Sequence, residues 1–225
     1  RKRYFYSQKE KGFSSRSKRY SEEKKNMKLP KGWQEVKIQE IASVDSGQGA
    51  PQGEKWYNGY EVFVKAGDLN FLNKGKYIGE HCKRISKDAI IRYKLRKYPK
   101  NSIVFPKSGM SVKTDNIALL EYDSYVVNHL AIIHVNSNDE DVTKYIYYLL
   151  KKIRISKLSL NDSYPSIRLN DVRKFKIIIP PHPQLKKIIT LLEKAEQIKQ
   201  WRKEADKLTD DYLNSVFFEM FGDPG

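Results

Sequence analysis

Short runs of apolar residues, each ended by turn residues, fill the middle of the chain and predict a series of β-strands. The predicted strands cover residues 61–65, 102–105, 117–120, 130–135 and 175–180, with glycine-rich loops at 47–53 and 107–110 between several of them. Apolar and aromatic residues recur at helical spacing from about Asp141 through Lys152, and residues 86–89 predict a further short helix. This mixture predicts an α+β domain with a curved or barrel-like β core and a few helices.

A different pattern follows the prolines that end at Pro183. From residue 184 to residue 221 no helix-breaking residue occurs, and apolar side chains recur every three or four positions. Such a helix is about 57 Å long at 1.5 Å per residue, and Gly222 and Pro224 end it. A helix of this length cannot bury its apolar stripe on one domain, so the pattern predicts a coiled-coil partner. The stripe comprises Ile188, Leu191, Ala195, Ile198, Ala205, Leu208, Tyr212 and Val216.

Charge divides the 225 residues into three segments. The formal net charge is +16, from 43 Lys and Arg against 27 Asp and Glu. Residues 1–28 contribute +8 and predict a basic N-terminal arm or linker, residues 29–181 contribute +9, and residues 182–225 contribute −1. This balance is typical of a protein that binds nucleic acid, because each neutralised phosphate releases counterions. The alternative is a merely basic protein, since net charge concerns association and not fold.

Composition excludes several classes of protein. No run approaches the ~20 apolar residues of a membrane span, and the start, Arg1 to Tyr4, lacks the apolar region of a secretory signal. The sequence has a single cysteine, Cys82, so neither an intramolecular disulfide framework nor a four-cysteine zinc site can form. We expect a protein of the reducing cytoplasm with no membrane partner.

No motif in the sequence predicts an active site. Pro180-Pro181 lacks the Asn and the aromatic residue of a DNA methyltransferase motif. Residues 35–37 have the acidic-x-Lys pattern of a metal-dependent nuclease but not its earlier acidic residue, and no P-loop occurs. His81 and Cys82 are adjacent, so in an extended segment they point to opposite faces and are poorly placed to chelate one zinc. We expect no catalytic residue, no metal and no cofactor.

Nucleic-acid binding has better support, because loops of the middle segment interleave basic, aromatic and amide side chains. Such side chains donate hydrogen bonds to phosphates and to base edges. His129 stands out among the histidines because Asn128-His129 directly precedes a predicted strand. For each residue singly the alternative is an ordinary solvated side chain, whereas together the loops predict a binding surface. The predicted DNA-binding residues are Lys65, Asp68, Lys107, Ser108, Lys113, Asn128, His129, Tyr164 and Arg168.

The order of several segments carries a resemblance to a known family. Leu-Pro-Lys-Gly-Trp opens residues 29–41, Asn-Ser-Ile-Val-Phe-Pro-Lys-Ser-Gly occupies residues 101–109, and Tyr-Pro-Ser-Ile-Arg begins at residue 164. An Ile-Pro-Pro run then leads into the long predicted helix. In this order the segments resemble the target recognition domain and spacer helix of the specificity (S) subunit of Type I restriction–modification systems. The chain departs from the family at Asn101-Ser102, where Gly-Asp is usual, and at His182, where a Glu-Gln pair is missing from the junction.

The resemblance implies a function and partners. Residues 29–181 would be a target recognition domain that reads one half-site of double-stranded DNA, and residues 182–225 a spacer helix that sets the half-site distance. Methyltransferase (modification) subunits and a restriction subunit would supply the catalysis. Family members usually carry two recognition domains and two spacer helices, whereas this sequence has one of each. We therefore expect a fragment of a longer chain with a second recognition domain, or a half-size subunit that forms a homodimer through its C-terminal helix.

Two other functions stay open from the sequence. The chain could be the recognition portion of a fused methyltransferase–nuclease restriction enzyme, which the sequence upstream of Arg1 would decide. It could also be a nucleic-acid-binding coiled-coil scaffold unrelated to restriction. The salt dependence and the base preference of duplex binding separate this scaffold from the first two functions.

Overall fold

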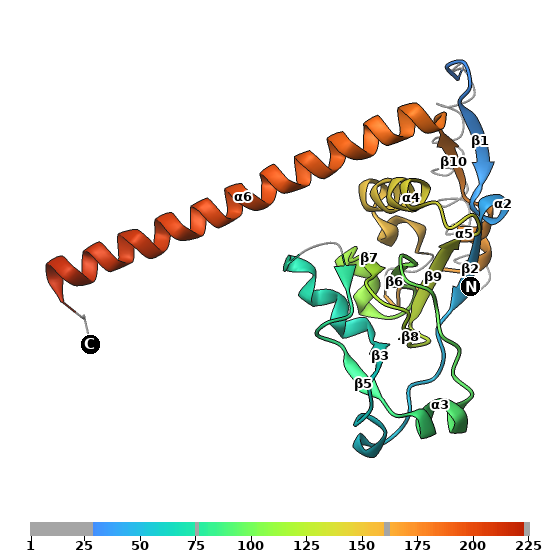
Figure 1. The fold of residues 1–225 in the computed structure, drawn as a ribbon, viewed down its shortest axis with the longest axis horizontal. Helices are drawn as coiled ribbons and strands as arrows, with labels where there is room; N and C mark the ends of the chain where they lie inside the picture. Colours follow the sequence, from blue (N-terminus) through green and yellow to red (C-terminus); the bar gives the residue numbers. More distant parts are fainter. Residues whose placement is uncertain (1–28, 75–76, 160–162, 223–225) are drawn as a thin grey trace, which may run out of the picture. The chain divides into compact units, whose positions relative to one another are not determined.

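The computed structural model describes residues 29–74, 77–159 and 163–222 (Figure 1). The chain divides into two compact units, Arg1–Pro181 and His182–Gly225. The basic arm expected at residues 1–28 lies outside the described residues. None of the described helices combines the length and the apolar character that a membrane span requires.

Short strands form three sheets in the first unit. A five-stranded sheet has the order β2-β9-β6-β7-β4, a three-stranded sheet has the order β5-β3-β8, and β1 pairs with β10. Most neighbours are antiparallel, but β3 runs parallel to β8 and β4 parallel to β7. The strands are β1 (Gln34–Lys37), β2 (Ala42–Ser46), β3 (Glu61–Val64), β4 (Tyr77–Ile78), β5 (Lys83–Ile85), β6 (Ile103–Pro106), β7 (Ala118–Leu120), β8 (Tyr125–Val126), β9 (Leu130–Val135) and β10 (Lys176–Ile179).

Two helices in the first unit, α3 and α4, begin at residues whose side chains cap them. Ser86 Oγ accepts a hydrogen bond from the backbone N–H of Ala89 (3.3 Å) at the start of α3, and Asp139 caps α4 in the same way. Both helices confirm predictions from the sequence, and α3 is longer than predicted. The α-helices are α2 (Ile38–Ile41), α3 (Lys87–Tyr93), α4 (Glu140–Ile153) and α5 (Leu169–Lys174), and the 3₁₀ helices are η1 (Glu54–Trp56), η2 (Ala66–Lys74), η3 (Met110–Thr114) and η4 (Ile155–Leu158).

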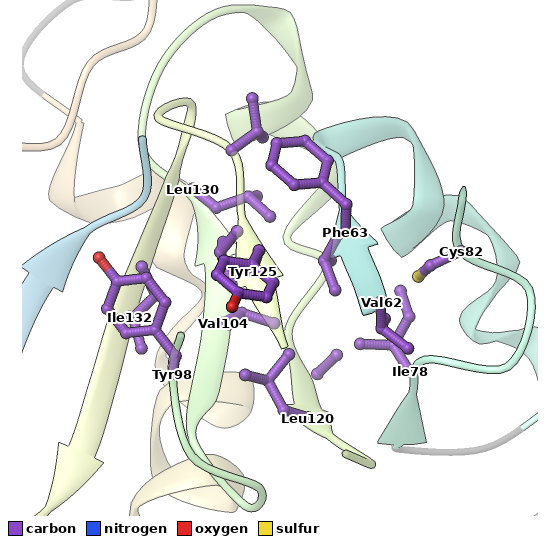
Figure 2. Packing of buried hydrophobic residues seen from close by; sticks show 14 of the residues in the cluster. Val62, Phe63, Ile78, Cys82, Tyr98, Val104, Leu120, Tyr125, Leu130 and Ile132 are labelled. Carbon is purple, nitrogen blue, oxygen red and sulfur yellow. The ribbon is translucent and has the colours of Figure 1, made fainter. Parts of the chain in front are cut away.

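One hydrophobic core joins the five-stranded and three-stranded sheets. Figure 2 shows Val62 and Phe63 of β3 on one side of this cluster and Leu130 and Ile132 of β9 on the other. Phe63 and Leu130 are fully buried. Burial of side chains of this size stabilises a fold by about 1.5–3 kcal/mol each. The core therefore fixes the two sheets, and the loops at their ends, relative to each other.

The α+β class predicted from the sequence is confirmed, but the described strands form no closed barrel. β2 and β4 are the two edges of the five-stranded sheet. At the β2 edge the guanidinium of Arg173, from α5, donates to the carbonyl oxygen of Val44 (2.6 Å). A side chain from a helix thus covers a backbone group that a further strand would pair with, which leaves the sheet open and its edge protected.

The second unit contains one long helix, α6 (His182–Phe221). Its 40 residues form a single uninterrupted helix (Figure 1), about 60 Å long at 1.5 Å per residue. It ends at Gly222, whose φ is 77° and whose N–H donates to the carbonyl oxygen of Phe218 (2.9 Å). The long C-terminal helix predicted from the sequence is confirmed.

Candidate nucleic-acid interface

Five strand ends meet at one edge of the first unit. β2 ends at Ser46, which pairs with Ala131 of β9. β6 ends at Pro106, which pairs with Leu130, also of β9. β3 and β8 end side by side in parallel register. The segments that leave these ends are therefore neighbours. Together with residues 163–168, which join them, we call them the loop face: residues 47–53, 65–69, 107–115, 127–129 and 163–168.

The turn between β8 and β9 is the centre of the loop face. The N–H of Asn128 donates to the carbonyl oxygen of Gln48 (2.8 Å), and the N–H of Lys107 donates to the carbonyl oxygen of His129 (2.9 Å). Two loops are thereby attached to one turn. Because backbone groups make the attachment, it does not use the side chains of these residues.

Gly47 lets the first loop approach this turn closely. A Cβ at this position would lie 2.2 Å from the carbonyl oxygens of Val126 and Val127, which is too short for any other residue. A Cβ at Gly49 would meet nothing within 4 Å. The glycine-rich loop thus contains one glycine that packing requires and one that packing leaves free to change.

A side-chain hydrogen bond joins Ser108 and His129. Ser108 Oγ lies 2.9 Å from His129 Nδ1, and the imidazole is exposed. The bond uses one ring nitrogen and restricts the orientation of the ring. It leaves Nε2 as the ring nitrogen available to a base edge.

Residues 163–168 run alongside the loop that follows β6. Ser166 forms an isolated antiparallel bridge with Ser108, and the N–H of Ile167 donates to the carbonyl oxygen of Lys107 (2.8 Å). The segment carries Tyr164, which is 64% exposed, and the exposed Arg168. The bridge therefore adds an aromatic side chain and a guanidinium to the loop face.

Lys113 belongs to the 3₁₀ helix η3, which follows the same loop. Its side chain is exposed. The helix starts at Gly109, whose φ of 79° favours glycine. It ends at Asp115, whose carboxylate accepts the N–H of Ser156 (2.7 Å). Both ends of the helix that carries Lys113 are therefore fixed.

Lys65 and Asp68 form a tight turn at the end of β3. The Asp68 carboxylate accepts the N–H of Lys65 (2.7 Å). It also hydrogen-bonds the Cys82 thiol, and burial, followed by the charge of Asp68 and this bond, raises the pKa of that thiol above its ordinary value. Asp68 thus has partners within the fold. The ammonium of Lys65 lies 4.0 Å from the centre of the Tyr57 ring.

The nine predicted DNA-binding residues all belong to segments of the loop face. Those nearest its centre are Lys107, Ser108, Asn128 and His129, and those on the adjoining segments are Lys65, Asp68, Lys113, Tyr164 and Arg168. Their contact with DNA stays a prediction. What the fold adds is that segments far apart in the sequence form one continuous surface.

Gln48, which was not predicted from the sequence, joins a further segment to the loop face. Its carboxamide donates to the carbonyl oxygen of Lys94 (3.0 Å) and accepts the N–H of Arg96. The Arg96 guanidinium donates to the Tyr98 hydroxyl (2.9 Å) and lies 3.2 Å from the Asp45 carboxylate, and these partners raise the pKa of Arg96. No motif or periodicity marks a carboxamide that binds two backbone groups, so the sequence offered no signal for it.

The long helix α6 presents a second surface. Its buried residues are Leu185 and Ile189, in the first turns. Of the predicted stripe, Ile188 and Val216 are half-buried, and Leu191, Ala195, Ile198, Ala205, Leu208 and Tyr212 are exposed. Further exposed apolar residues that were not part of the predicted stripe are Trp201, Leu213, Phe217, Phe218, Met220 and Phe221. Exposed apolar side chains at helical spacing are typical of a helix that pairs with another.

Comparison with known proteins identifies relatives of the chain. Residues 30–207 match the family described as the Type I restriction modification DNA specificity domain. The Type I restriction enzyme MjaIX specificity subunit of Methanocaldococcus jannaschii is 31% identical over 169 residues, which are 73% of this chain and 38% of that protein.

Two solved structures share the fold. One comes from work on complex assembly and conformational transition of the type I R-M system, with a TM-score of 0.67 and 17% identity over 85% of this chain and 45% of that one. The other is the HsdS subunit from Thermoanaerobacter tengcongensis, with a TM-score of 0.55 and 15% identity over 80% of this chain and 41% of that one. The chain spans less than half the length of each of these relatives.

Proposed function

The chain belongs to the family of Type I restriction modification DNA specificity domains, and we propose on this basis that it recognises a sequence in double-stranded DNA for a restriction–modification complex. In this proposal residues 29–181 are the target recognition domain, and the loop face binds one half-site. The observation that carries the proposal is the loop face itself, where nine residues of DNA-binding chemistry lie on adjoining segments.

The chemistry of the loop face supports both phosphate binding and base reading. Lys107, Lys113 and Arg168 supply positive charge for phosphates, and Asn128 and His129 supply donors and acceptors for base edges. Backbone hydrogen bonds hold these segments in place before DNA arrives, which lowers the entropy cost of binding. The net charge of +16 favours association with a polyanion.

We assign α6 the role of a spacer between two half-sites. Its exposed apolar residues support pairing with a helix of the same kind. A second recognition domain in a longer chain would supply that helix, or a second copy of this chain would. Two identical copies joined by a two-fold interface would place identical readers on a palindromic, interrupted site.

We place methyl transfer and DNA cleavage on other subunits, the modification and restriction subunits. The relative from Methanocaldococcus jannaschii is named a specificity subunit of a restriction enzyme, which supports a recognition role. We place the complex in the cytoplasm because its DNA substrate is there.

Two measurements on the purified chain test the proposal. The dissociation constant of a duplex with the preferred sequence should be lower than that of a scrambled duplex, by about 10³-fold or more. Incubation with S-adenosylmethionine, or with Mg²⁺ and ATP, should give neither methylated nor cleaved DNA. Equal affinity for both duplexes would contradict the recognition role. Methylation or cleavage by the chain alone would contradict the assignment of catalysis to other subunits.

A further inference from the structure

A cluster of cations and aromatic rings adjoins the loop face. It comes from η1, the end of β3, the start of β5 and α3. We define this basic–aromatic patch as Lys55, Trp56, Tyr57, Lys65, Lys83 and Arg92. We propose, building on the function proposed above, that the patch binds the sugar–phosphate backbone of the duplex outside the bases that the loop face reads. Lys65 belongs to both surfaces, so the two surfaces adjoin.

The cations of the patch are held against aromatic rings. Lys55 Nζ lies 4.9 Å from the centre of the Trp56 ring, and the Arg92 guanidinium carbon lies 5.8 Å from the same centre. The ammonium groups of Lys65 and Lys83 lie 4.0 and 5.2 Å from the centre of the Tyr57 ring. A ring orients a cation without neutralising its charge. These charges therefore remain available to a phosphate.

Besides the carboxylate of Asp68, which accepts the backbone N–H of Lys65 (2.7 Å), the carboxylate of Glu54 lies among these cations. Its two oxygens are 2.9 and 3.0 Å from Lys83 Nζ, and Lys83 lowers the pKa of Glu54. In the described part of the chain, Lys55, Lys65 and Arg92 form no ion pair. Four cations against these two carboxylates leave the patch positive, which complements a polyanion.

The fold fixes the patch before any ligand binds. The N–H of Ser86 donates to the carbonyl oxygen of Trp56 (2.9 Å), and the Ser86 hydroxyl caps α3. A Cβ at Gly59 would lie 1.9 Å from the carbonyl oxygen of Ile85, so the turn after η1 sits directly against β5. Trp56 also packs against the hydrophobic core. A surface of this kind binds phosphates with little cost of ordering.

The contacts of the rings favour phosphate binding over stacking with a base. Trp56 meets Tyr93 edge to face, with ring centres 5.9 Å apart, in addition to its two cations. Tyr57 meets Phe63 edge to face at 6.1 Å, and its hydroxyl donates to the carbonyl oxygen of Pro51 (3.0 Å). The rings already have partners on several sides, whereas stacking proteins offer an open ring face. Phosphate contacts carry no sequence information, so the patch adds affinity and not preference.

The double variant Lys55→Gln, Arg92→Gln tests this inference on the full chain. We expect its affinity for the preferred and the scrambled duplex to fall by the same factor, about tenfold, and its slope of log K against log salt to become shallower by roughly 0.9 for each phosphate that is no longer neutralised. The ratio of the two affinities stays unchanged. The matched control is Lys100→Gln, Lys174→Gln, because both lysines are exposed and lie outside the patch and the loop face. This control keeps wild-type affinity.

Lysine acetylation of the wild-type chain, with and without the scrambled duplex, gives a second readout that needs no variant. Lys55 and Lys83 become protected, and Lys100 does not. Unchanged affinity and slope in the patch variant, a loss confined to the preferred duplex, or unprotected Lys55 and Lys83 would each overturn the inference while the recognition function stands. A wild-type chain that binds no duplex would refute the proposed function and this inference with it.

Discussion

Ser108 Oγ lies 2.9 Å from His129 Nδ1, and this bond joins residues that are 21 positions apart in the chain. Ser108 follows β6 and His129 precedes β9, and these two strands are paired antiparallel. The pairing of the strands therefore brings the two side chains together. The bond restricts the orientation of an exposed imidazole, so its free ring nitrogen is suited to distinguish one base edge from another.

Removal of this imidazole should weaken base preference. We expect His129→Ala to reduce the preference for one base pair by about 10- to 100-fold, because a side chain that reads a base edge contributes ~1–3 kcal/mol of discrimination. Affinity for scrambled duplex should stay the same. Ser108→Ala frees the ring without removing it, so its effect should be smaller, and Ser43→Ala, distant on β2, should have none. Competition binding with single-base variants of the preferred duplex measures this, and unchanged preference in His129→Ala would exclude base reading by this residue.

Charge on the loop after β6 should contribute affinity. We expect Lys107→Ala and Lys113→Ala each to weaken binding to every duplex, because each removes one phosphate contact and its counterion release. Each should make the salt slope shallower by about 0.9, whereas Lys100→Ala should not. Titration at several salt concentrations measures both quantities. Wild-type affinity in both variants at low salt would remove this loop from the interface.

Gly47 should be intolerant of a side chain. The Cβ of Gly47→Ala would lie 2.2 Å from two backbone oxygens, and we expect the free energy of unfolding to fall by about 1–3 kcal/mol, as in other overpacked sites. Gly49→Ala is the matched control, because its Cβ would meet nothing within 4 Å. Urea unfolding followed by circular dichroism compares the two variants. Equal stability would show that the loop relaxes away from the turn between β8 and β9.

The buried thiol should make stability depend on pH. Burial and Asp68 raise the pKa of Cys82 in the folded chain. Above the unfolded value of about 8.5, the unfolded chain loses the thiol proton while the folded chain keeps it, so the free energy of unfolding falls by up to about 1.4 kcal/mol per further pH unit. Below that pH the contribution is complete. Urea unfolding from about pH 7.5 to pH 10 should show a steeper decline in the wild type than in Cys82→Ala, in which only groups such as the buried Tyr125 and the half-buried Tyr145 contribute near pH 10, and parallel curves would contradict the assignment.

The exposed stripe of α6 should mediate association. Leu208 is 68% exposed, and we expect Leu208→Asp to abolish dimers of the purified chain, since it places a charge in an apolar seam. Asn214→Asp introduces the same charge at an exposed polar position of the helix and should leave dimers intact. Sedimentation velocity measures the outcome. A monomeric wild-type chain would indicate that the partner helix belongs to a longer chain.

Elements that depend on local pattern were predictable from the sequence. α6 follows from a long segment without a helix breaker, and β9 follows from a continuous apolar run between turn residues. The open sheet was not predictable. The parallel pairing of β3 with β8, and the cover that Arg173 gives to β2, depend on residues far apart in the chain.

The same distinction holds for the candidate site. The sequence predicted which loops carry donors and cations, because residue type alone indicates that chemistry. It did not predict the role of Gln48, which binds backbone groups of residues 94 and 96. Nor did it predict that Arg92 lies over the ring of Trp56, since only the packing of α3 against η1 brings them together.

Selection of bound sequences from a random duplex pool, with the purified chain alone and with methyltransferase subunits added, is the decisive test of sequence recognition. We expect a short set of base pairs to be enriched in both selections. Where two molecules of the chain pair through α6, this set should occur twice in the DNA, as inverted repeats at a fixed distance. A pool that stays random in both selections, or equal retention of single-stranded RNA, would contradict sequence recognition in duplex DNA.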